Sequence, residues 1–121
     1  MRGWIGASAL AGAVLLAGPA AAQDKVSYNQ YTLCAAATAM LQDVSAGNAP
    51  KVEHYAKETQ RNYLKAISVV TERGVDLVKA KGVVDDLKAR ATKVFQDDIP
   101  GSFTPSLGQC KDMGLIKMWE Q

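Results

Sequence analysis

The feature that most constrains the fold is a run of mainly apolar residues between positions 52 and 70 that recur at spacings of three and four. The members of this run are Val52, Tyr55, Ala56, Thr59, Tyr63, Ala66, Ile67 and Val70. A repeat of this period places its members on one face of an α-helix, whereas a half-buried strand requires strict alternation of apolar and polar residues. No sustained alternation of that kind occurs elsewhere in the sequence, so we expect helices and no strands.

Two further long segments also predict helices. Residues 28–44 are apolar around most of the circumference of a helix, which favours burial at the centre of a bundle. Thr38 interrupts one apolar stripe there, but its hydroxyl can bond to a backbone carbonyl one turn earlier. A third helix is expected from about residue 75 to residue 97, and Gly82 leaves open whether it is continuous, bent or broken. Its predicted core stripe is Leu77, Ala80, Val84, Leu87, Ala91, Val94 and Phe95.

The ends of these helices carry recognisable residues. Asn48 is a predicted cap for the second helix, with Pro50 in the first turn, and Gly74 is suited to terminate it. Further along, Pro100-Gly101 fits the central positions of a type II turn.

A short last helix is predicted after that turn. Thr104 is its expected cap, with Pro105 at the first helical position. Gly114 either ends this helix or is followed by further helical residues.

Two cysteines, Cys34 and Cys110, lie near the two ends of the predicted helical region. In an exported protein two thiols indicate one structural disulfide, and closing a loop of this length stabilises the fold by roughly 4 kcal/mol. A redox-active pair usually has the C-x-x-C spacing, and structural zinc requires four Cys or His ligands. The sequence therefore predicts an all-α, single-domain bundle of three to four helices, stapled by a disulfide between these two residues.

The first 22 residues have the layout of a secretory signal peptide. Arg2 supplies the positive start, residues 4–16 are uncharged and mostly apolar, and Ala20-Ala21-Ala22 forms a small-residue cleavage site. The apolar run is too short for a spanning helix, which needs about 20 residues. We expect residues 1–22 to be removed, residues 23–121 to form the helical domain without stable membrane insertion, and the protein to reside in the periplasm or be secreted.

Charge and motifs exclude several functions. Without Arg2, thirteen Lys and Arg face twelve Asp and Glu, which is no basic footprint for nucleic acid. His54 is the only histidine, and it shares the polar face of its helix with Glu58. Phosphate-loop, hydrolase-elbow, metalloprotease and EF-hand patterns are missing. We therefore predict no catalytic residues, cofactor or metal, and a protein that is not an enzyme.

One candidate binding region follows the third helix. Asp97 and Asp98 oppose the helix dipole at its C-terminus, and local rule-breaking of this kind sometimes marks function. Phe103 adds a large apolar side chain to the same loop. The plainer interpretation is a solvated helix end with Phe103 tucked into the core.

A second candidate consists of the aromatic residues Tyr28, Tyr31 and Trp119. A disulfide that joins the first and last helices would bring these residues toward one another. An exposed aromatic patch would mark an interface, whereas a covered one is simply the end of the core.

The predicted function is binding rather than catalysis. The expected partner is another protein of the bacterial envelope, for which the chain would act as an inhibitor, an accessory subunit or a chaperone. The alternative is a carrier or sensor of a small apolar ligand held in a pocket between helices.

Overall fold

A computed structural model of the chain describes residues 25–120, and this part is entirely helical. Its elements are α4 (Tyr28–Val44), α5 (Ala49–Thr71), α6 (Leu77–Asp97), the π-helical turn η1 (Ile99–Phe103) and α7 (Thr104–Asp112). No strand occurs in this range, so the predicted all-α bundle is confirmed. The predicted signal peptide, residues 1–22, lies outside the described residues.

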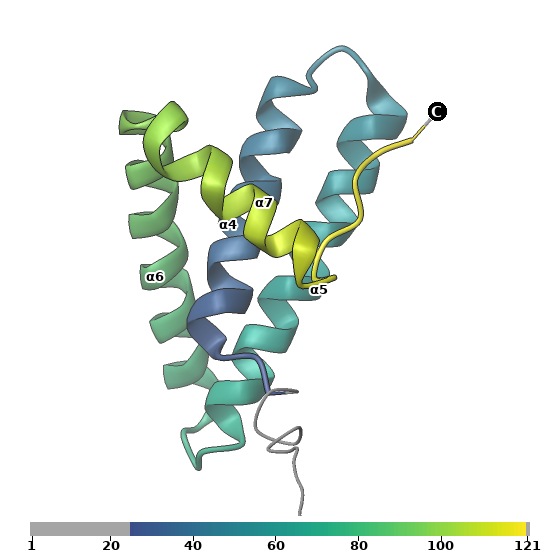
Figure 1. The fold of residues 1–121 in the computed structure, drawn as a ribbon. Helices are drawn as coiled ribbons and strands as arrows, with labels where there is room; N and C mark the ends of the chain where they lie inside the picture. Colours follow the sequence, from purple (N-terminus) through teal and green to yellow (C-terminus); the bar gives the residue numbers. More distant parts are fainter. Residues whose placement is uncertain (1–24, 121) are drawn as a thin grey trace, which may run out of the picture.

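Helix α4 is the central element of the bundle. It packs against α5 on one side and α6 on the other, and α7 crosses over it (Figure 1). After α7, residues 115–120, which we call the tail, run back along α5 toward the start of that helix (Figure 1). The predicted central burial of residues 28–44 is therefore correct.

The three long helices begin where a polar side chain caps the first turn. Ser27, Asn48 and Asp76 each accept a hydrogen bond from the amide three residues later, at 3.1–3.2 Å. Such caps satisfy a backbone donor that has no partner within the helix. The cap at Asn48 was expected, and α6 proves continuous through Gly82.

The structure corrects two predictions around η1. Pro100-Gly101 does not form a type II turn, which needs a positive φ at its third residue, because Gly101 has no such φ and lies within the π-helical turn. Thr104 does not cap α7 with its side chain, because Phe103 before it is already helical. Gly114, with φ +74°, lies just beyond the end of α7, and residues 115–120 are not helical.

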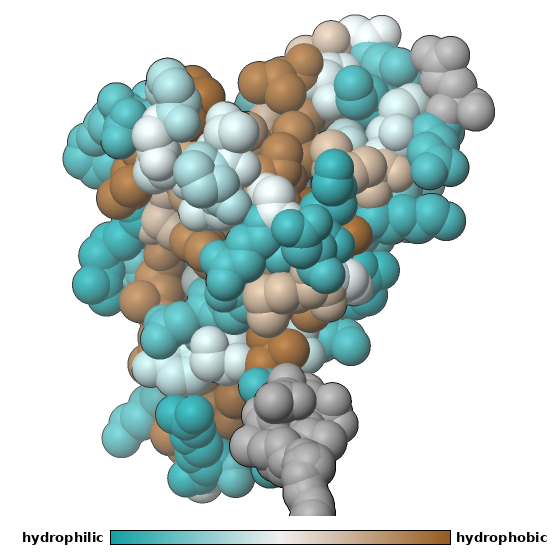
Figure 2. All heavy atoms as spheres, viewed as in Figure 1, coloured by the Kyte–Doolittle hydropathy of each residue, from teal (hydrophilic) through white to brown (hydrophobic). Residues whose placement is uncertain are grey.

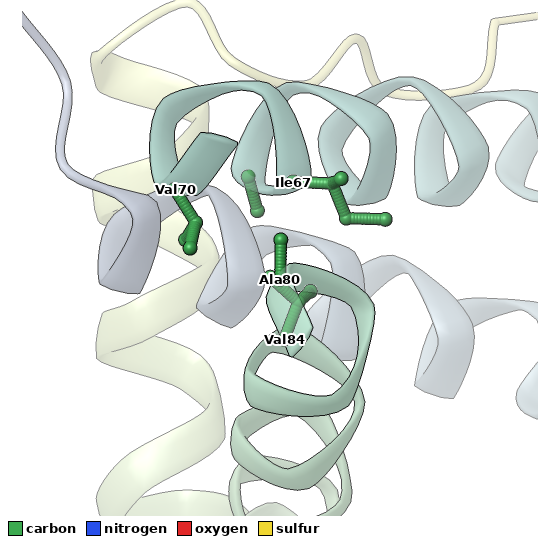
Figure 3. Packing of buried hydrophobic residues seen from close by; sticks show 5 residues of the cluster. Ile67, Val70, Ala80 and Val84 are labelled. Carbon is green, nitrogen blue, oxygen red and sulfur yellow. The ribbon is translucent and has the colours of Figure 1, made fainter. Parts of the chain in front are cut away.

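The first part of the core lies where α5 meets the start of α6. Ala66, Ile67 and Val70 of α5 face Ala80 and Val84 of α6 (Figure 3). The two alanines allow the helices to approach closely. The contact lies near the short turn that joins the two helices, because its residues come from the end of α5 and the start of α6.

The second part of the core joins α4 to α6 and η1. Ala36, Ala37 and Met40 surround Phe95, which is 1% exposed and meets the ring of Phe103 edge-on at 5.5 Å between centroids. These residues pack the far end of α6 against α4.

The predicted disulfide between Cys34 and Cys110 is present, with 5.7 Å between the two Cα atoms. Both cysteines are fully buried, and Ile116 of the tail packs on them. The bridge therefore fixes α7 on α4 and sets where the tail begins.

A polar contact lies inside the interface between α4 and α5. The Thr38 hydroxyl bonds back to the Cys34 carbonyl, as predicted, and also lies 2.8 Å from the hydroxyl of Thr59. Gln42 donates to the same Thr59 hydroxyl at 2.9 Å. Because buried hydroxyls need partners, this contact fixes the lengthwise register of the two helices.

The predicted core stripe of α6 is only partly buried. Leu77 and Val94 were expected in the core but are 60% and 52% exposed. Val84 and Phe95 are buried, because α4 and the end of α5 cover them. Among residues 25–120 no further element lies over the flank that carries Val94.

Candidate functional site

The tail is held on α5 by side chains that bond to its backbone. The Leu115 carbonyl accepts hydrogen bonds from Arg61 at 2.7 Å and from Asn62 at 3.0 Å. Two residues later, the Lys117 amide donates to Glu58 at 2.7 Å. An extended segment is thus bound through its main chain by one face of a helix.

Glu58 is buried, although the sequence placed it on the polar surface of its helix. Its carboxylate forms two hydrogen bonds with Arg61, at 2.6 and 2.9 Å, and also accepts the Lys117 amide. The tail covers this carboxylate, so its burial depends on residues almost sixty positions away. A buried carboxylate is tolerated only when it is paired in this way.

His54 and Tyr55 hold the end of the tail. A ring nitrogen of His54 bonds to the Lys117 carbonyl, and the Tyr55 hydroxyl accepts the Trp119 amide at 3.0 Å. The His54 ring meets the Trp119 ring edge-on, with 5.8 Å between centroids. His54 therefore has a structural contact in place of the solvated surface position that its polar helix face had suggested.

A hollow of about 350 Å³ opens where the tail, α4 and α5 meet. Its walls are formed by Tyr31 of α4, by Arg61, Asn62 and Lys65 of α5, and by residues 114–117. Four polar side chains of the walls thus come from α4 and α5. The contact between Thr38 and Thr59 fixes the register of these two helices.

A second hollow of about 720 Å³ adjoins the first, because Tyr31 and Lys65 line both. Lys25 and Arg73 contribute further positive charge, and Glu72 is the one carboxylate in the described lining. The Lys65 ammonium lies 5.9 Å from the centre of the Tyr31 ring. A cation in this position is attracted to the face of the ring.

Asn62 contributes an unusual buried atom to this site. Its side chain is 1% exposed, and its amide nitrogen donates to the backbone carbonyls of Glu58 and Leu115, both at 3.0 Å. Its Oδ1 atom has no hydrogen-bond partner among the described residues. Because both bonded neighbours are acceptors, the amide cannot be turned over to exchange the two atoms.

The first predicted binding region lies at the end of α6. Asp97 forms an exposed ion pair with Lys93 at 3.2 Å, and the backbone carbonyl of Asp98 accepts two bonds from Ser102. Phe103 is half-buried against Phe95, in agreement with the plainer interpretation of this residue. The two acids remain exposed beside the helix end.

The predicted aromatic residues lie at two separate places. Tyr28 and Tyr31 pack on the α5–α6 part of the core, and the Arg73 guanidinium lies 5.2 Å from the centre of the Tyr28 ring. Trp119 instead lies beside His54, at the other end of α5. The disulfide brings α7 to α4, but the tail then runs away from the two tyrosines.

An apolar flank of α6 is left uncovered by the described residues. Val83 and Val94 are 40% and 52% exposed, and Leu87 lies half-buried between them on the same side of the helix. In Figure 2 apolar side chains interrupt the polar surface along α6, at the left of the view. Ile99, 46% exposed, follows just beyond the end of the helix.

Among the described titratable groups, Tyr63 is the one whose pKa is clearly shifted, and it contacts Asp85. The Tyr63 hydroxyl donates to the Asp85 carboxylate at 2.7 Å. This hydrogen bond, then burial, then the negative charge of Asp85 raise the pKa of Tyr63 to about 12. The raised pKa favours the neutral phenol, so Tyr63 keeps the proton that it donates to Asp85.

Sequence reasoning missed Asn62, Lys65 and Lys117. Asn62 lies at the helical spacing of Tyr55 and Ala66, and a polar residue within an apolar stripe is the signal that would have found it. The two lysines carry no comparable signal, because the position of the tail decides what surrounds them.

No protein-family model, curated protein or solved structure matches this chain. Within residues 25–120, no group of three or more His, Cys, Asp or Glu side chains is arranged to hold a metal ion. None of the described helices has the length and apolar character needed to cross a membrane.

Proposed function

We propose that this chain is an exported, disulfide-locked helical protein that acts by binding a protein partner in the bacterial envelope. The buried disulfide supports an oxidising compartment, in which such bridges persist. The observation that carries the binding proposal is the uncovered apolar flank of α6. Val83, Leu87 and Val94 on this flank are apolar positions of a kind that a bundle normally covers.

The partner proposed for this flank is an amphipathic helix of an envelope protein. The span from Val83 to Val94 is about 17 Å at 1.5 Å per residue, which matches three turns of a second helix. The stripe is bordered at helical spacing by Lys79, Arg90 and Asp97. Charges of both signs at the border select a partner helix with complementary charges beside its apolar residues.

The predicted acidic residues belong to the edge of this surface. Asp97 lies one turn beyond Val94, and Ile99 extends the exposed apolar positions into η1. In this proposal Asp97 contributes to orientation and Val94 contributes to affinity.

The alternative function, a carrier of a small apolar ligand, has less support. Three hollows formed by the described residues all have charged side chains in their walls, including Lys65 in two of them and Lys88 in the third. Sites for apolar ligands are lined mainly by hydrophobic side chains.

Site-specific cross-linking tests the proposal. A photoreactive residue at position 83 or 94 of the oxidised protein is expected to capture the same envelope protein, through a segment with helical amphipathic spacing. The control position is Lys81, which is exposed on the opposite side of the same helix. Equal capture from position 81 would contradict the proposal.

A matched pair of substitutions measures affinity for the captured protein. Val94→Lys is expected to weaken binding by about tenfold or more, because a charge would be placed inside the apolar contact. Leu64→Lys changes a residue of α5 with the same 52% exposure and is expected to leave binding unchanged. Equal effects of the two changes would show that the flank of α6 is not the interface.

A further inference from the structure

The charges beside the uncovered flank of α6 follow a symmetrical order along the helix. Lys79 lies nine residues before position 88 and Asp97 lies nine residues after it. Asp86 and Arg90 lie two residues before and after the same position. All four side chains are exposed. Each of them is thus matched, at the same distance on the other side of position 88, by a residue of opposite charge.

These charges lie along one side of the apolar stripe. The helix is continuous from Leu77 to Asp97, and the eighteen residues between Lys79 and Asp97 make five full turns. Both side chains therefore share one angular position, about 27 Å apart along the axis. Val83 comes four residues after Lys79, and Val94 three residues before Asp97, which are the spacings of neighbours on a helix surface.

This order of charges is complementary to itself when the helix is turned end to end. In an antiparallel pair with a two-fold axis at the level of position 88, a residue before that level faces the residue equally far beyond it. Lys79 then faces Asp97 of the second copy, Asp86 faces its Arg90, and each pair occurs twice. A parallel pair would place every residue level with its own copy, so the opposite charges would not meet.

The apolar residues fit the same arrangement. Val83 and Val94 are 40% and 52% exposed, and in the antiparallel pair Val83 comes within about 1.5 Å, along the axis, of the level of the second copy's Val94. Leu87, half-buried in one molecule, lies next to the two-fold axis and close to its own copy. Helix α6 forms an outer edge of the bundle in Figure 1, where a second molecule can approach it.

We propose that the amphipathic helix that binds this flank is α6 of a second copy of the chain, packed antiparallel about that two-fold axis. The inference rests on the proposed function, which makes the flank a binding site for a helix, and it names the partner. A contact over three helical turns is smaller than the roughly 1,200 Å² at which standard interfaces begin. The dimer is therefore weak and reversible.

Sedimentation equilibrium of the purified, oxidised mature protein tests the inference. The chain is expected to form a concentration-dependent dimer and no larger species, because a two-fold contact closes after two copies. Lys79→Glu and Asp97→Lys are each expected to weaken the dimer by about tenfold, since each sets like charges against one another twice. Neither change opposes the helix dipole, which favours acids at the N-terminus and bases at the C-terminus.

Mixing the two variants separates pairing from a general loss of structure. An equimolar mixture of Lys79→Glu and Asp97→Lys is expected to regain the wild-type affinity, because the chain with two acids at these positions then faces the chain with two lysines. Misfolded variants would not recover on mixing. Lys81→Glu is the matched control, because it makes the same change of charge on the opposite side of α6 and should leave the dimer unchanged.

Three results would overturn the inference: a chain that stays monomeric at about 1 mM, a mixture that binds no more tightly than the separate variants, or an equal loss in Lys81→Glu. The proposed function is tested separately by cross-linking from positions 83 and 94 in an envelope extract. Capture of a different envelope protein there, with a monomeric purified chain, would reject the second copy and retain the binding function. A monomeric chain that captures nothing would reject both.

Discussion

Helices α5 and α6 are alike in length and composition but differ in how much of their surface is covered. They contain 23 and 21 residues, and both carry an apolar stripe among mixed charges. Seven residues of α5 are buried, including Glu58 and Asn62, whereas α6 buries only Ala80, Val84 and Phe95.

The cause of the difference lies in the neighbours of each helix. Helix α5 packs against α4 along its length and carries the tail on another side. Helix α6 has α4 along it, but it meets α5 mainly near the connecting turn. The burial of a helix face therefore depends on which other segments of the chain pack against it. An amphipathic sequence indicates only which face of the helix can be buried.

The largest expected effect tests the few buried positions of α6. Phe95→Ala should destabilise the fold by about 3–5 kcal/mol, because it removes a fully buried ring and leaves a cavity. Val94→Ala, at the neighbouring exposed position, should change stability by less than about 0.5 kcal/mol. Urea unfolding followed by circular dichroism measures both. Similar losses for the two variants would contradict the exposed position of Val94.

The next effect concerns the bridge that places the tail. Reduction, or replacement of Cys34 and Cys110 by serine, should lower stability by roughly 4 kcal/mol in the chain-entropy model. That is a large share of the 5–15 kcal/mol typical of a folded domain. We also expect amide exchange to rise in the tail more than in the middle of α6. An unchanged melting temperature after reduction would remove the structural role given to the bridge.

A smaller effect tests the polar hold of α5 on the tail. Glu58→Gln should cost about 1.5–3 kcal/mol, because a charged group that accepts hydrogen bonds from Arg61 and Lys117 becomes neutral. Trp119 fluorescence reports release of the tail. Glu53→Gln is the control, since Glu53 forms an exposed ion pair with Lys57 and its loss should have little effect. Equal destabilisation by both changes would show that the tail contact contributes little.

The smallest expected effect concerns the ionisation of Tyr63, whose hydroxyl bonds to Asp85 and so joins α5 to α6. The pKa of Tyr63 is raised to about 12, mainly by its bond to the Asp85 carboxylate, and an unfolded tyrosine ionises near pH 10. The contact therefore contributes to stability below pH 10 and loses that contribution as the pH rises to about 12. Absorbance titration should show one late tyrosine, and Asp85→Asn should lower its pKa. No change in that variant would contradict the assignment.

The sequence predicted features that depend on nearby residues and missed those that depend on distant ones. Residues 28–44 and the cap at Asn48 follow from local spacing and side-chain chemistry, and the pairing of Cys34 with Cys110 follows from their number. The burial of Glu58 and the exposure of Val94 depend on where the tail and α4 lie. The turn at Pro100-Gly101 was mispredicted because a local motif does not show that the helical path continues into α7.

For the candidate sites the same distinction holds. Asp97 and Phe103 were found because they break or complete local patterns, and their binding role remains a prediction. Lys65 and Lys117 come together only in three dimensions, so the charged hollow that they line was not visible in the order of residues.

The position of the bridge also determines how the molecule can respond to a pulling force. Residues 34–110 form a closed covalent loop. Tension applied to residues 25 and 121 of the oxidised chain can extend only the roughly twenty residues outside that loop, or about 70 Å at 3.5 Å per residue. The tail lies directly in the path of that tension, whereas α6 is shielded from it. The segment that covers α5 would thus peel away while the uncovered helix kept its place.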